Sequence, residues 1–108
     1  MSAILMPVAA RIAATLNTAN GKSEHETAMR LMKVTEEAGE ATAAYIGMTG
    51  QNPRKGISHT TADVADELCD VIIAATVALH SFTDTPAADL TAKLDTAARR
   101  LNTRRETP

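Results

Sequence analysis

The sequence predicts an all-α fold of four main helices in a bundle, with oligomerisation completing the core. Apolar residues recur at three- and four-residue steps, and no segment shows the period-two alternation or the Asn-Gly turn of a β-hairpin. Aromatic residues are only 2% of the chain and Trp is absent, so the core must be built from small and aliphatic side chains, which suit close-packed helices. The 108 residues form one domain, 1–108, with a core that a subunit interface would enlarge.

The first helix is expected over residues 2–18. Its apolar residues share one face, at Ile4, Val8, Ile12 and Leu16. A second helix is expected to begin after Ser23, because Ser23 and Glu26 have the spacing of a capping box, in which each side chain satisfies a free backbone amide. Gly47 is the expected stop, so this helix covers about 24–46. Gly39 lies inside it at a cost of about 1 kcal/mol relative to Ala, which predicts close approach of a neighbouring helix or ligand.

The connection 48–59 is long and contains two Gly and one Pro, which predicts a loop. It also carries two adjacent cations, Arg54 and Lys55. Functional residues gather on loops, so these cations are candidates for binding phosphate beside an acidic site. The alternative is a solvated loop without a binding role.

The third helix is expected to start at Thr60 or Thr61 and to run to about residue 80. Its second half, 71–79, has no charged residue on any side, and a helix that is apolar all round is buried. Cys69, just before this stretch, is expected to be a small buried residue.

The fourth helix is expected to start at Pro86, since Pro is favoured at the first helical position. Its buried side carries Leu90, Leu94 and Leu101. Residues 103–108 are expected to form a frayed tail.

Charge and cysteine content restrict the class of protein. The net charge of −2 and the absence of a clustered basic patch argue against a nucleic-acid partner. The single cysteine excludes an intrachain disulfide, and the apolar N-terminal stretch lacks a basic leader, so a cytoplasmic location is expected. No apolar run approaches the roughly 20 residues of a membrane span, so no membrane partner is expected.

Two acidic pairs are the candidate functional residues: Glu37 with Glu40, and Glu67 with Asp70. A spacing of three places both carboxylates of a pair on one helical face, where like charges repel. Two facing pairs would make a nest of four carboxylates that a cation would hold together. Oxygen ligands without Cys or His favour Mg²⁺, with Mn²⁺ as a substitute. Neither pair continues to a His as in di-iron bundles, which argues against iron and zinc.

The alternative is that each acidic pair belongs to a solvated helix face. In that case Lys33 and Arg30 would neutralise Glu37 as ordinary surface ion pairs. The pairing of two such units on different helices, the second beside an apolar stretch, favours a site.

The run Glu36-Glu37-x-x-Glu40, then 26 intervening residues, then Glu67-x-x-Asp70, resembles the signature of the MazG-like all-α nucleoside triphosphate pyrophosphohydrolases. The resemblance covers about residues 23–82. It implies a hydrolase that uses Mg²⁺ to cleave a (deoxy)nucleoside triphosphate between the α- and β-phosphates, with nucleotide-pool cleaning as a candidate role. It also implies homodimers or homotetramers whose helices complete one another's sites.

Residue roles follow from the same resemblance. The implied metal ligands are Glu37, Glu40, Glu67 and Asp70. Glu36 would orient or activate the attacking water. The candidate phosphate contacts are Lys33, Arg54 and Lys55. Two alternatives stay open, namely the related enzyme phosphoribosyl-ATP pyrophosphohydrolase and a non-catalytic helical interaction module.

Overall fold

The computed structural model describes residues 3–106, with the side chains of residues 3–103, and this part of the chain is helical without strands. The helices are α1 (Leu5–Asn20), α2 (Glu24–Thr49), α3 (Thr61–Leu79) and α4 (Pro86–Glu106). The all-α prediction and the number of main helices are therefore confirmed. No helix in the described range is long and apolar enough to cross a membrane.

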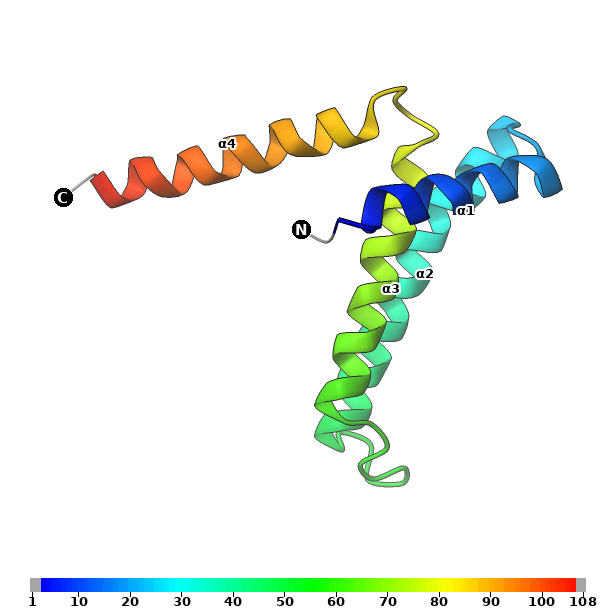
Figure 1. The fold of residues 1–108 in the computed structure, drawn as a ribbon. Helices are drawn as coiled ribbons and strands as arrows, with labels where there is room; N and C mark the ends of the chain where they lie inside the picture. Colours follow the sequence, from blue (N-terminus) through cyan, green and yellow to red (C-terminus); the bar gives the residue numbers. More distant parts are fainter. Residues whose placement is uncertain (1–2, 107–108) are drawn as a thin grey trace.

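The helices form an antiparallel α2–α3 hairpin with α1 lying across its end, while α4 extends away from the other three (Figure 1). The loop between α2 and α3 lies at the opposite end of the hairpin from α1 (Figure 1). The radius of gyration is 17.5 Å, whereas a compact chain of this length has about 13 Å. Within one chain, the fourth helix thus stands apart from the three that pack together.

Local caps set the starts of α2 and α3, as predicted. Ser23 Oγ accepts a hydrogen bond from the Glu26 amide at 3.1 Å, and Thr60 forms a complete capping box with Asp63. The box at Ser23 is only half formed, because the Glu26 carboxylate accepts a hydrogen bond from Arg30 instead. This side chain is therefore used for a tertiary purpose rather than for its own helix start.

The end of α2 differs from the prediction. The helix continues through Gly47 and ends at Gly50, which adopts a left-handed φ of 68°. Glycine at Gly47 has another explanation: the returning loop lies close to it, since the Ser58 amide donates to its carbonyl at 3.0 Å. A Cβ there would collide with the side chains of Ser58 and His59. The returning loop, rather than the helix stop, requires glycine at Gly47.

The end of α4 also differs, since the helix continues to Glu106 where fraying was expected from 103. Residues 107 and 108 of the expected tail lie outside the described part. At Gly39 a Cβ would meet nothing within 4 Å. The predicted close approach to Gly39 is therefore not made by this chain.

The core of the single chain is small and built mainly from alanines. Its buried apolar residues are Ala9, Ala13, Ala41, Ala44, Val77 and Ala78. The prediction that 71–79 is buried is correct only towards its end, because Ile72 is 54% exposed. Cys69 is also exposed, contrary to expectation. The reason in both cases is that none of the helices in residues 3–106 covers this face of α3.

The surface area reflects this open arrangement. The chain exposes 7957 Å², against about 5,800 Å² for a compact monomer of its mass. Many of its large apolar side chains are exposed, including Leu31, Met32, Leu68 and Ile72 on the hairpin and Leu94 on α4.

Candidate functional site

The hairpin brings carboxylates from two helices to one point. One oxygen each of Glu37 on α2 and of Glu67 and Asp70 on α3 lie within 4.8 Å of one another. Glu36 and Glu40 form a second such group with Glu37. We call these five residues the carboxylate cluster. The structure thus brings together the four predicted metal ligands and the predicted catalytic Glu36.

The carboxylate cluster contains more negative charge than its surroundings neutralise. Glu37 is buried, and Glu67 Oε2 is shielded from solvent without a hydrogen-bond partner. The pKa of Glu40 is raised, first by the charge of Glu37, then by partial desolvation and by Glu67. A buried polar atom without a partner is costly. A cation is the chemical group that would relieve both the repulsion and the unpaired oxygen.

Lys33 is the basic residue at this cluster. Its Nζ lies 2.6 Å from Glu36 Oε1 and 3.1 Å from Glu37 Oε1. The hydrogen bond to Glu36, followed by that to Glu37, raises the pKa of Lys33. The pairing of Lys33 with Glu37, which the solvated-face alternative predicts, is present, but Glu37 is buried rather than on a solvated face.

The other two predicted phosphate contacts lie elsewhere. Arg54 and Lys55 are exposed on the loop at the far end of the hairpin (Figure 1). Neither belongs to the carboxylate cluster or lines the pocket beside it. Phosphate binding by these two residues stays a prediction. The position of their loop within one chain, away from the carboxylate cluster, does not favour it.

A pocket of about 620 Å³ adjoins the carboxylate cluster between α1, α2 and α3. Glu37 and Asp70 belong to both. The remaining walls are mostly apolar, formed by Ile12, Leu16, Met29, Ile73, Ala74 and Val77. Its size and its apolar walls with a few polar groups are typical of small-molecule sites.

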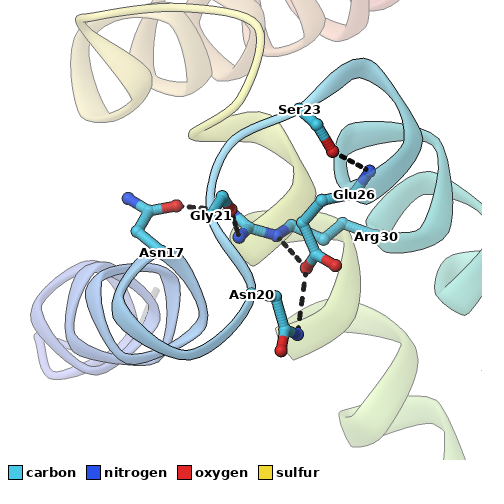
Figure 2. A network of polar contacts seen from close by, with 6 residues as sticks. All are labelled: Asn17, Asn20, Gly21, Ser23, Glu26 and Arg30. Carbon is cyan, nitrogen blue, oxygen red and sulfur yellow. Dashed lines mark hydrogen bonds and ion pairs between the residues drawn. The ribbon is translucent and has the colours of Figure 1, made fainter.

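The opposite end of the pocket is formed by a network around Arg30, which is 7% exposed (Figure 2). Arg30 Nε donates to Glu26 Oε2 at 2.8 Å, Nη1 to Asn17 Oδ1 at 2.8 Å, and Nη2 to the Gly21 carbonyl at 3.0 Å. Asn20 Nδ2 also faces Glu26 Oε2, at 3.4 Å. The network ties the end of α1 to the start of α2 and so shapes the pocket.

Sequence reasoning missed this network. It placed Arg30 beside Glu37, seven residues along, whereas the structure pairs Arg30 with Glu26, four residues before it. The i,i+4 spacing of Glu26 and Arg30 is a recognisable signal. Their burial could not be inferred from spacing, because it depends on how α1 packs on α3 and brings Asn17 to Arg30.

Comparison of the chain with protein-family models, with curated proteins and with solved structures gives no match.

Proposed function

We propose that this protein is a Mg²⁺-dependent pyrophosphohydrolase, which cleaves a nucleoside triphosphate between its α- and β-phosphates to give the monophosphate and pyrophosphate. The proposal is carried by one observation: carboxylates of α2 and α3 converge at the mouth of a pocket, with Glu67 Oε2 left unpartnered. An all-oxygen donor set of this kind suits Mg²⁺ shared with substrate phosphates.

The donors fit the ion, with Glu37, Glu67 and Asp70 as the central ligands and Glu40 at the side. When bound, Mg²⁺ supplies charge neutralisation for the triphosphate and acidifies coordinated water. Glu36, exposed beside the cluster, would orient the attacking water through its free oxygen. Lys33 would exchange its carboxylate partners for phosphate oxygens, while the apolar pocket walls hold the nucleoside and exclude water.

The proposed enzyme is a homodimer or homotetramer. Each chain exposes about 2,000 Å² more than a compact monomer would, and a standard interface takes only about 800 Å² from each partner. The uncovered apolar face of α3 and the projecting α4 supply surface for such contacts. A second copy would supply the helices that complete the bundle. Light scattering of the purified protein tests this, and a monomer at micromolar concentration would contradict it.

The activity test measures products. Purified protein with Mg²⁺ and a panel of nucleoside triphosphates should release pyrophosphate and not orthophosphate. Asp70→Asn and Glu40→Gln should lower the rate by at least the roughly 10- to 100-fold that loss of a residue bonded to a metal ligand costs, because these two residues are themselves proposed ligands. Asp66→Asn is the matched control, because Asp66 is exposed on the same helix outside the carboxylate cluster. Orthophosphate as the sole product, or equal activity in all three variants, would refute the mechanism.

The exposed apolar surface favours one second candidate, a non-catalytic interaction module. A thermal melt separates the two, because a ligand that binds only the folded state raises its stability. An unchanged melting temperature with Mg²⁺, with nucleotide and with both together would favour the module. Product analysis with phosphoribosyl-ATP separates the related enzyme from the broader class.

A further inference from the structure

The end of the pocket far from the carboxylate cluster offers hydrogen-bond acceptors. Three of the five N–H groups of Arg30 donate to protein oxygens, on Asn17, Gly21 and Glu26 (Figure 2). The Glu26 side chain is only 13% exposed and lines the pocket. Its Oε2 accepts from Arg30 and Asn20, whereas its Oε1 receives no hydrogen bond from the described residues. Glu26 Oε1 is therefore available to a ligand.

Asn20 provides a second acceptor beside it. A carboxylate only accepts, so the Asn20 amide must turn its nitrogen towards Glu26, at 3.4 Å. Its Oδ1 then points away from Glu26, as Figure 2 shows, and accepts no hydrogen bond from the part of the chain that the structure describes. The hydrogen bond from Arg30 lowers the pKa of Glu26, which keeps this carboxylate an acceptor at neutral pH. Glu26 Oε1 and Asn20 Oδ1 therefore offer two acceptors to a ligand that brings donors to this end.

The distance along α2 matches the two ends of one nucleotide. Glu26 and Glu37 are separated by about 16 Å along the helix axis, at 1.5 Å per residue. Lys33 and the apolar Met29 line the pocket between them. With the phosphates at the carboxylate cluster, the sugar falls near the middle and the far edge of the base reaches Glu26 and Asn20.

We propose that Glu26 and Asn20 are specificity-determining residues that select a base with an exocyclic amino group, as in cytosine or adenine, over its oxo counterpart in uracil or hypoxanthine. This inference rests on the proposed function for the orientation of the nucleotide. The amino group donates its two hydrogens to the two acceptor oxygens. An oxo group at the same position places an acceptor against a carboxylate and leaves both acceptor oxygens unpaired, which weakens its binding relative to the amino group.

The test uses deoxycytidine and deoxyuridine, which differ at this group and carry no phosphate. Titrations followed by NMR, without metal, should show deoxycytidine binding at least about 10-fold tighter. The Asn20 side-chain amide signals should move with deoxycytidine. Glu26→Gln should bring the two affinities to within about 3-fold, because its amide can turn a donor towards the oxo group.

Two further variants test whether the preference for deoxycytidine comes from these acceptors. Asn20→Ala removes the second acceptor and should also reduce the preference for deoxycytidine. It tests the inference even if Glu26→Gln does not fold. Thr18→Ala is the matched control, since Thr18 is exposed on the same helix as Asn20, its hydroxyl donates to the Ala14 carbonyl and it does not line the pocket, and it should keep the preference.

Equal affinities in the unaltered protein, binding of neither nucleoside, or a preference that survives both Glu26→Gln and Asn20→Ala would overturn the inference. The titration needs neither metal nor hydrolysis. A clear preference without pyrophosphate release would therefore refute the proposed function alone, and pyrophosphate release with equal affinities would refute this inference alone.

Discussion

Helix α2 carries two polar groups that differ in charge balance. Near its start, Glu26 meets the buried Arg30, whose three nitrogens are all bonded. Near its middle, the carboxylate cluster holds five acids against the ammonium of Lys33, with one buried oxygen unpaired. The first group is satisfied by the protein and holds α1 to α2. The second has one cationic side chain among five acids, which makes it the candidate site for a ligand.

The largest expected effect on stability comes from breaking the satisfied group. Arg30→Ala should lower the free energy of unfolding by about 3 kcal/mol, because it removes three hydrogen bonds of a buried guanidinium group, one of them to the half-buried Glu26 carboxylate. Urea denaturation followed by circular dichroism measures this. Arg11→Ala, at an exposed position of α1, is the control and should change stability by less than about 0.5 kcal/mol. A loss below about 1 kcal/mol for Arg30→Ala would show that the network is not structural.

At the carboxylate cluster, by contrast, we expect the stability of the protein to depend on a bound metal ion. Mg²⁺ at 100 times its dissociation constant should stabilise the protein by about 2.7 kcal/mol. Glu67→Gln should remove most of this gain while leaving the metal-free protein at least as stable, because it relieves repulsion around an unpaired oxygen. Thermal melts with and without Mg²⁺ measure both quantities. A metal response that is retained in Glu67→Gln would contradict the assignment of this ligand.

The two groups should also differ in the sign of their pH dependence. Arg30 lowers the pKa of Glu26 from its ordinary 4.5, so the stability from this pair is present above pH 4.5 and is lost as the pH falls through the folded pKa. The pKa of Glu40 is raised from the same value, chiefly by Glu37. Its contribution is present below pH 4.5 and is lost as the pH rises through the folded pKa.

Denaturation of the metal-free protein across pH 3 to 7 tests both signs. Compared with the unaltered chain, Glu26→Gln should flatten the acid side of the stability profile, and Glu40→Gln should remove the loss on the side above pH 4.5. If the free energy of unfolding changed with pH at the same slope in both variants, the two groups would not differ in charge balance.

The features that sequence could predict are the local ones. The starts of α2 and α3 follow from Ser23 and Thr60, whose side chains bond within one turn. The grouping of Glu37 with Glu67 and Asp70 follows from three-residue spacing together with the antiparallel hairpin, although its choice as one site also rested on the family resemblance. In each case the determining contacts lie within one helix or between two consecutive helices.

Features that depend on distant parts of the chain were missed. The burial of Arg30 depends on α1, which packs on α3 and brings Asn17 to Arg30. The glycine at Gly47 leaves room for the side chains of Ser58 and His59 in the returning loop. The exposure of Ile72 results from α4 lying away from α3. An apolar pattern predicts that a face is covered, but it does not say whether the cover comes from the same chain.

A substitution at Gly39 has the smallest expected effect on stability, and it tests whether a second copy of the chain covers this face of α2. In the single chain a Cβ at Gly39 meets nothing within 4 Å, so Gly39→Ala should stabilise α2 by about 1 kcal/mol through helix propensity alone. If a second copy packs closely over this position, the added methyl group should instead weaken the assembly. Urea denaturation at several protein concentrations distinguishes the two outcomes: a gain that is independent of concentration places Gly39 outside the subunit interface, and a loss that grows on dilution places it inside.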